Sequence, residues 1–319
     1  MDLEFNQNNQ HTLASKACFS GPGLHTGIYA DLCLKPERPG FGFRFQRVDL
    51  PGQPVIAADC DLVSDTFRCT TLTDQEASIS TVEHVLAALV GCGIDNCLIE
   101  VNGPEVPIVD GSCQGLVKMI ERAGRIEQKA PKIWYHLDEK ISHRYLDKNV
   151  MMFALPCEHY SIETFVDFKS NVLEPQHATL NRITDFKKDI APCRTYCFVH
   201  ELEMLIDKNL IKGDVVGNAI LINDEPISDV EMRRLQKKFK LKNNTVQDGI
   251  YLNTLKLHFE NEIARHKLMD VIGDLSLTGF AIHAKILGIR PGHSTNVEFA
   301  KKVKHHILKK NASKFAVVA

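Results

Sequence analysis

The segment 264–274, ARHKLMDVIGD, places more constraint on the fold than any other part of the chain. On a helix, residues four apart share a face, so His266, Asp270 and Asp274 form one stripe. Apolar residues around them, such as Val271 and Leu275, predict a helix that is buried on at least one side. An imidazole and a carboxylate one turn apart can bind one metal ion. The alternative is a solvated polar face with a surface His–Asp pair.

The composition is that of a globular protein. The chain has 319 residues, of which 44% are hydrophobic and 24% charged, a length that suggests about two domains. Lys plus Arg number 38 and Asp plus Glu 40, a balance that argues against a nucleic-acid partner. We interpret the basic stretches 233–242 and 301–310 as solvated faces.

The sequence also predicts where the protein works. It contains no apolar run near 20 residues and no secretory signal, so we expect a cytoplasmic protein without stable membrane insertion.

The ten cysteines form no CxxC pair. We therefore expect mostly reduced thiols and no structural zinc site built from cysteines.

Hydrophobic periodicity predicts two α/β halves, 1–128 and 132–310, joined by a polar linker at 126–132. In the first half we expect strands at 28–34 and 41–45 joined as a hairpin-like unit, a helix at 81–91, a strand at 96–102 and a helix at 116–123. In the second half we expect strands at 133–140, 149–155, 160–168, 218–223 and 281–289. The helices expected there are 199–211, 261–278 and 296–310, with a charged surface helix and loop at 224–248.

A second motif, STVEHV at 80–85, has two interpretations. Ser80 and Glu83 fit a capping box, in which Glu83 bonds back to the Ser80 N–H. Alternatively, Glu83 is a general base and His84 a metal ligand, since adjacent placement at a helix start would put a carboxylate beside the metal. The pattern alone does not decide between them.

A third motif, RPGHS at 290–294, places His293 after a sharp turn at the end of a strand, where catalytic groups are common.

Together the three motifs supply two histidines and a carboxylate as metal ligands, and leave one glutamate and one histidine for other roles. This is the ligand set of hydrolytic zinc enzymes. The HEXXH, P-loop, GxGxxG and GxSxG patterns are absent, which argues against the classes that they define.

Six ordered segments resemble the UDP-3-O-acyl-N-acetylglucosamine deacetylases, the zinc amidases of lipid A synthesis in Gram-negative bacteria. The segments are SGPGLHTG (20–27), STVEHVLAAL (80–89), GIDNCLIEVNGPEVPIVDGS (93–112), CRTYCF (193–198), RHKLMDVIGD (265–274) and PGHSTN (291–296). The resemblance runs from about residue 10 to about residue 307. It implies two similar α/β domains, each a mixed sheet with helices, and helices sandwiched between the two sheets.

The resemblance also implies roles for residues of the active site. The residues that match the family's metal ligands are His84, His266 and Asp270, with zinc as the metal and ferrous iron as the alternative. Glu83 matches the general base, and His293 matches the residue that acts as general acid or stabilises developing charge. Asp274 matches the carboxylate that orients this histidine, and Thr195 matches a hydroxyl that helps to hold the oxyanion.

Further positions match substrate contacts of the family. Lys267 matches a cation beside the metal, and Lys148 a diphosphate contact. Asp167 and Phe168 lie where the family has an aromatic residue that stacks on uracil, and Tyr196 stands where phenylalanine is frequent.

The segment 199–223 resembles an inserted unit that lines a passage for the acyl chain. Its predicted wall residues are Leu202, Ala219 and Leu221, for which ordinary core packing is the alternative. Asp214 occupies a position where the family often has glycine.

The function implied is hydrolysis of the 2-acetamido group of UDP-3-O-(3-hydroxyacyl)-N-acetylglucosamine to acetate and the free amine. Two alternatives remain open, namely a non-catalytic homologue that binds nucleotide sugars and a zinc amidohydrolase of another N-acetyl sugar. We expect a monomer whose only partner is its acylated UDP-sugar substrate. Whether Cys69 binds a second metal stays open.

Overall fold

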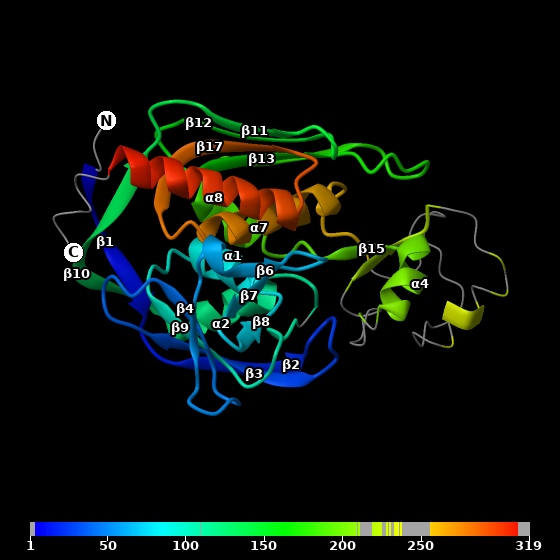
Figure 1. Ribbon diagram of the computed structural model, residues 1–319, viewed down its shortest axis with the longest axis horizontal. Coiled ribbons are helices and arrows are strands. Elements are labelled where there is room, and N and C mark those ends of the chain that lie inside the picture. Colours follow the sequence, from blue (N-terminus) through cyan, green and yellow to red (C-terminus); the bar gives the residue numbers. More distant parts are fainter. Residues whose placement is uncertain are drawn as a thin grey trace.

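Two β-sheets enclose two layers of helices in the computed structural model (Figure 1). The structure describes residues 4–108, 110–208, 210, 219–224, 228, 230, 233–235, 237 and 256–311. In Figure 1 one sheet lies at the top, the other at the bottom, and α1, α2, α7 and α8 lie between them. The predicted α/β fold with helices between two sheets is confirmed.

The lower sheet has the order β2-β3-β9-β4-β5. Its strands are β2 (Ala17–Pro22), β3 (Tyr29–Pro36), β4 (Phe43–Arg47), β5 (Val55–Ala57) and β9 (Cys97–Val101). β9 pairs antiparallel with β3 and parallel with β4, so the predicted hairpin between 28–34 and 41–45 is wrong. The period-2 pattern identified both strands, but a pattern within one strand does not say which strand pairs with it.

A smaller sheet lies beside the lower sheet and leads into α1. It contains β6 (Val63–Asp65), β7 (Thr71–Asp74) and β8 (Ala77–Ile79), preceded by the short helix η1 (Cys60–Leu62). The β6–β7 turn contains Cys69 and Thr70, both of them buried. The end of this turn therefore reaches into the interior, while Phe67 earlier in the turn is exposed.

The upper sheet has β17 (Ala281–Ile289) at its centre. β17 pairs antiparallel with β12 and parallel with both β13 and β10. The other strands are β1 (Glu4–Leu13), β10 (Arg125–His136), β11 (Ile141–Tyr145), β12 (Val150–Pro156), β13 (Ser161–Val166) and β14 (Gln176–Leu180). β17 alternates half-buried and buried side chains along its whole length, so one of its faces packs on the helices.

The predicted linker at 126–132 is part of a strand instead. β10 spans it and pairs antiparallel with β1 over most of its length, from Arg125 opposite Leu13 to Trp134 opposite Glu4. Most β10 side chains are at least partly exposed, which explains their polar composition. Pro131 lies opposite Asn9, at a register shift where the ladder is already irregular. The division into halves at 1–128 and 132–310 stays a prediction.

The predicted helices are confirmed, with ends that differ by a few residues. They are α1 (Glu83–Gly91), α2 (Gln114–Ala123), α4 (Val199–Asp207), α7 (Glu262–Ser276) and α8 (His293–Lys310). Two short elements, η2 (Ile183–Asp185) and α3 (Phe186–Asp189), lie between β14 and the inserted unit. α8 begins at His293 rather than at 296, so the third motif lies at a helix start.

α1 and α7 pack against each other at very close range at Gly273. A Cβ atom added at Gly273 would lie 2.2 Å from the backbone oxygen of Glu83. Only glycine permits this approach without displacing one helix. The crossing therefore sets the position of the α1 start against the middle of α7.

The inserted unit is a β–α–β element at one end of the molecule (Figure 1). β15 (Tyr196–Phe198) and β16 (Ile220–Ile222) pair in parallel, with α4 between them in sequence. The carboxylate of Glu201 on α4 accepts two hydrogen bonds from the guanidinium of Arg68, at 2.5 and 3.0 Å. This ion pair joins the unit to the β6–β7 turn. Asp214 and most of 224–248 lie outside the described residues.

Cys18 and Cys33 form a disulfide between β2 and β3, so the expectation of reduced thiols does not hold for this pair. The other eight cysteines are free thiols, and all except Cys157 are buried. Among the described residues, the structure has no helix that is both long and apolar enough to cross a membrane.

Replacing Gly273 by alanine tests the helix crossing. We expect Gly273→Ala to lower the free energy of unfolding by about 1–3 kcal/mol, because overpacking forces backbone shifts. Chemical denaturation measures the change. Gly21→Ala in β2 is the matched control, since a Cβ there would make only ordinary van der Waals contacts, the nearest at 3.5 Å. Equal stability of the two variants would contradict a tight crossing.

Candidate metal and acid–base site

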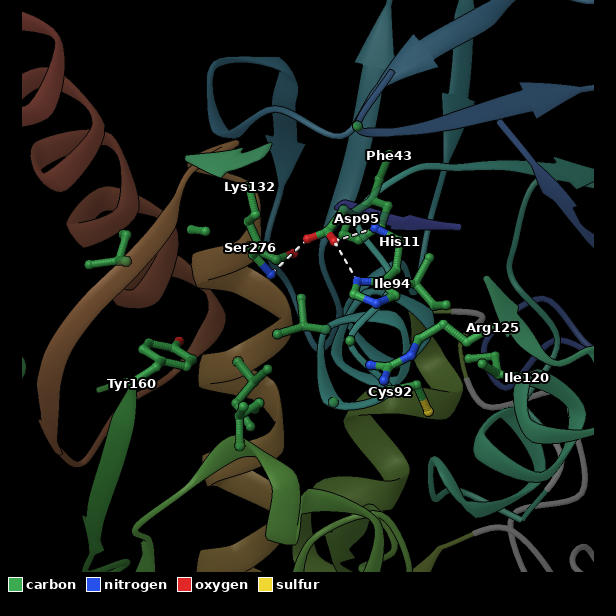
Figure 2. A pocket seen from close by; sticks show the side chains of 18 of the residues that line it. His11, Phe43, Cys92, Ile94, Asp95, Ile120, Arg125, Lys132, Tyr160 and Ser276 are labelled. Carbon is green, nitrogen blue, oxygen red and sulfur yellow. Dashed lines mark hydrogen bonds and ion pairs between the residues drawn. The ribbon is translucent and has the colours of Figure 1, made fainter. Parts of the chain in front are cut away.

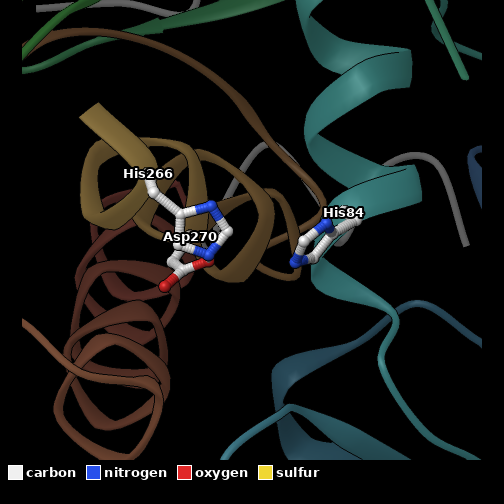
Figure 3. Close-up of side chains that lie close together, drawn as sticks. All are labelled: His84, His266 and Asp270. Atoms are coloured by element: carbon white, nitrogen blue, oxygen red, sulfur yellow. The ribbon is translucent and has the colours of Figure 1, made fainter. Parts of the chain in front are cut away.

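The α1–α7 crossing brings His84, His266 and Asp270 together (Figure 3). Each residue offers one ligand atom, and these atoms all lie within 4.8 Å of one another. All three side chains are buried, with exposed fractions of 5%, 3% and 2%. Residues distant in sequence thus form one compact group, as a single metal site requires.

The bonding of these residues suits a divalent metal. His266 donates its Nδ1–H to the carbonyl of Cys193 at 3.2 Å, which leaves the Nε2 lone pair free on the side of Asp270, 3.5 Å away. Within the described part of the chain, neither His84 Nδ1 nor Asp270 Oδ1, both of them buried, has a hydrogen-bond partner. Unpaired buried polar atoms are costly unless a ligand satisfies them. Two imidazoles and a carboxylate are a donor set for zinc and also for ferrous iron.

Burial keeps the two imidazoles in their neutral form, which is the form that binds metals. Burial is the main cause that lowers the pKa of His84, to about 3, and the nearby His266 adds to it. Burial likewise lowers the pKa of His266. Both rings therefore offer lone pairs at neutral pH.

Asp270 is held in its charged form by its neighbours. Burial opposes the charge, but Lys267 and His266 outweigh burial and lower the pKa of Asp270. The ammonium of Lys267 lies 2.8 Å from Asp270 Oδ2. The structure thus places Lys267 beside the cluster, as the resemblance implies, and its charge faces Asp270.

Glu83 does not form the predicted capping box. The N-cap position is Val82, no side chain caps the helix, and the Ser80 hydroxyl donates to the carbonyl of Pro104. Glu83 instead turns inward, where its Oε2 accepts the N–H of Thr70 at 3.0 Å. Burial raises the pKa of Glu83 to about 7. A carboxylate with this pKa is suited to general-base work at neutral pH.

His293 and Asp274 form a buried pair next to the cluster. His293 Nδ1 lies 3.0 Å from Asp274 Oδ2, and His293 Nε2 lies 3.8 Å from Asp270. Burial opposes a charged imidazole, but Asp274 and then Asp270 outweigh it and raise the pKa of His293 to about 9. His293 is therefore positively charged at neutral pH.

Thr70 connects these acid–base groups, although no sequence motif indicated this role. Its hydroxyl donates to Asp274 Oδ1 at 2.6 Å and lies 3.4 Å from His293 Nδ1, while its N–H donates to Glu83. Asn296, also missed, donates to Asp274 Oδ2 at 2.9 Å. A threonine between two strands carries no local signal of such contacts, because all of its partners are distant in sequence.

The segment 193–198 lies against the cluster. Cys193 accepts from His266, and the Tyr196 ring lies edge-on to the His266 ring with centroids 6.2 Å apart. Thr195 lies between them in sequence, where its N–H donates to Gly111 and its carbonyl accepts from Ile220. A buried ion pair between Arg194 and Glu262 anchors the segment to the first turn of α7.

The predicted substrate-binding residues form three separate groups. Phe168 packs edge-on against Tyr196, with centroids 5.4 Å apart, while the neighbouring Asp167 forms an ion pair with Arg290. Lys148 is exposed and its Nζ lies 3.3 Å from the Ser294 hydroxyl, next to His293. The predicted wall residues of the inserted unit, Leu202, Ala219 and Leu221, are buried in one apolar cluster with Val199 and Leu205.

By fold and site, this is a mixed α/β protein with a buried His–His–Asp group suited to a divalent metal. The family model of UDP-3-O-acyl N-acetylglycosamine deacetylases matches residues 10–241 and 227–305. The chain belongs to this family.

Curated relatives agree with the family. The chain is 41% identical over 305 residues to the bifunctional enzyme LpxC/FabZ of Porphyromonas gingivalis, a match covering 95% of this chain and 66% of the relative. It is 42% identical to the enzyme of the same name from Bacteroides thetaiotaomicron, with 93% and 65% covered. It is 33% identical to the UDP-3-O-acyl-N-acetylglucosamine deacetylase of Trichormus variabilis, with 92% and 98% covered. The chain thus spans slightly less than two thirds of the length of the two bifunctional relatives.

Replacing Thr70 by valine tests the polar network. We expect Thr70→Val to lower the free energy of unfolding by about 1–3 kcal/mol, because a buried Asp274 oxygen loses its donor. Thermal or chemical denaturation measures the change. Thr71→Val, the same substitution at a partly exposed neighbour, serves as control and should shift stability by less than about 0.5 kcal/mol. A Thr70 variant as stable as this control would show that the hydroxyl contributes nothing.

Proposed function

We propose that the chain is a metal-dependent deacetylase that hydrolyses the 2-acetamido group of UDP-3-O-(3-hydroxyacyl)-N-acetylglucosamine, the committed step of lipid A synthesis. The observation that carries this proposal is the His84–His266–Asp270 cluster. Beside the cluster lie Glu83, a carboxylate with a pKa of about 7, and His293, a charged imidazole. The names of the relatives support the substrate class.

The metal would be held by His84, His266 and Asp270, with zinc or ferrous iron as candidates. When bound, such an ion polarises a carbonyl and makes water more acidic. The side chains beside it supply the proton transfers. Glu83 is fixed by the Thr70 N–H and titrates near neutrality, so it takes a proton from the attacking water.

His293 supplies positive charge on the other side of the cluster. Because it is protonated at neutral pH, it stabilises the oxyanion as the carbonyl is attacked and can hand its proton to the departing amine. Asp274 keeps the ring oriented by accepting from Nδ1, which leaves Nε2 directed at the reaction centre. The hydroxyl of Thr195 is a second donor proposed for the oxyanion.

The rest of the substrate would extend away from this centre. Lys148, exposed beside the start of α8, is suited to the diphosphate. The Phe168–Tyr196 pair offers an aromatic surface for uracil, and Lys267 a cation for substrate groups beside the metal. The inserted unit, with Leu202, Ala219 and Leu221, is proposed for the acyl chain, since burial of each methylene contributes about 0.8 kcal/mol. A cytoplasmic, monomeric enzyme is in keeping with this role.

Replacing Glu83 by glutamine tests the base. We expect Glu83→Gln to lower kcat about 10²–10⁴-fold while metal content is unchanged, because the amide keeps the shape but accepts no proton. Acetate release from the acylated UDP-sugar and elemental analysis measure the two quantities. Glu76→Gln at an exposed turn is the matched control. A near-normal kcat would remove Glu83 from the mechanism.

Replacing His266 by alanine tests the ligand set. We expect purified His266→Ala to contain less than about a tenth of the wild-type metal and to lack activity, because two ligands hold a divalent ion poorly. His177→Ala, which removes an exposed histidine from β14, should keep its metal. Full metal loading of the His266 variant would exclude His266 as a ligand.

Replacing Asp274 by asparagine tests the charge on His293. The carboxylate raises the pKa of His293, so its removal lowers this pKa, and the protonated form is lost at lower pH. We expect the alkaline limb of the kcat/KM profile of metal-loaded enzyme to move to lower pH, with a lower maximum. An unmoved alkaline limb would assign that limb to another group.

A further inference from the structure

A second pocket of about 910 Å³ lies between the two sheets, away from the metal cluster (Figure 2). It is lined by the end of α1 and the following turn, residues 90–94, and by the last turns of α7, including Ser276. Glu83 and His84 lie at the opposite end of α1, about 12 Å away at a rise of 1.5 Å per residue. None of the residues assigned above to the reaction lines this pocket.

The pocket lies where residues of both layers meet, and its lining combines large apolar side chains with glycines and alanines. Phe43 and Ala58 come from the lower sheet, Ala281 and Ile282 from β17 in the upper sheet. Gly93 and Gly279 add no side chains, and both have positive φ values, 70° and 74°, that favour glycine. Apolar walls with a few polar groups and a volume of this size are typical of small-molecule sites.

The charged side chains of the pocket leave one cation in excess. The lining contains three cationic residues, Arg125, Lys132 and Lys187, and two carboxylates, those of Asp95 and Glu121. Lys132 pairs with Asp95 at 2.7 Å, and Lys187 pairs with Glu121 at 2.9 Å. Among the described residues, Arg125 has no carboxylate partner.

Arg125 is an exposed residue at the start of β10, and its guanidinium lies beside Gly93 of the pocket wall. One of its guanidinium nitrogens lies so close to Gly93 that a Cβ there would be 2.5 Å from it. Figure 2 shows Arg125 among the lining residues of the pocket. An accessible guanidinium without a carboxylate partner is suited to bind an anionic group.

We propose that this pocket is a second ligand site, which binds a small molecule with an apolar body and one anionic group. Arg125 binds the anionic group. The apolar body packs between the α1 end, α7 and Phe43. The aryl sulfonate 1-anilinonaphthalene-8-sulfonate has this chemistry and serves as the probe.

Titration of the metal-loaded full chain with this probe tests the site. Trp134, the only tryptophan of the chain, lines the pocket, so quenching of its emission reports binding. We expect saturable binding that Arg125→Ala weakens at least about tenfold, because a charge-assisted contact is lost. Arg122→Ala, at an exposed position in the last turn of α2 and outside the lining, is the matched control and should bind within about twofold of wild type.

A filled pocket provides an independent check. Ser276→Phe places a ring in the space between α7 and the Asp95–Lys132 pair, and we expect it to abolish probe binding while metal content and circular dichroism stay unchanged. If this variant does not fold, the Arg125 and Arg122 pair still decides. Absence of saturable binding in wild type, or equal affinity of the Arg125→Ala and Arg122→Ala variants, would overturn the proposal.

Discussion

The contact between α1 and α7 at Gly273 is the constraint on which the site depends. Because no side chain separates the helices there, the Glu83 backbone lies directly on α7. His84 then comes within reach of His266 and Asp270, and Glu83 turns toward Thr70. A glycine without catalytic chemistry thus brings together groups from two helices that lie far apart in sequence.

Burial gives the assembled groups their chemical character. The imidazoles of His84 and His266 lose their charge because desolvation dominates. His293 is also desolvated, but it keeps its charge because the carboxylates of Asp274 and Asp270 face it. Thr70, Asn296 and His293 all lie within hydrogen-bond distance of the oxygens of Asp274. Within one small volume, two histidines are therefore neutral and a third is charged.

The parts of the site with a local pattern were predictable from sequence. The stripe His266, Asp270 and Asp274 follows from helical spacing alone, and the α7 helix is where the pattern placed it. Thr70 and Asn296 were not predictable, because their contacts depend on how the β6–β7 turn and the start of α8 meet in space. The same reason explains the errors in the fold. β9 enters between β3 and β4, and β10 finds β1 as a partner, through long-range pairing that a single segment does not encode.

The β1–β10 ladder limits how the two sheets can move relative to each other. β1 pairs with β10, β10 continues onto β17 of the upper sheet, and Thr12 of β1 bridges Asn96, next to the lower sheet. A hinge motion that separates the two sheets would have to break the backbone hydrogen bonds of this ladder one after another. The ladder therefore ties the two sheets into one body at this edge of the molecule, and we expect the spacing between them to vary little.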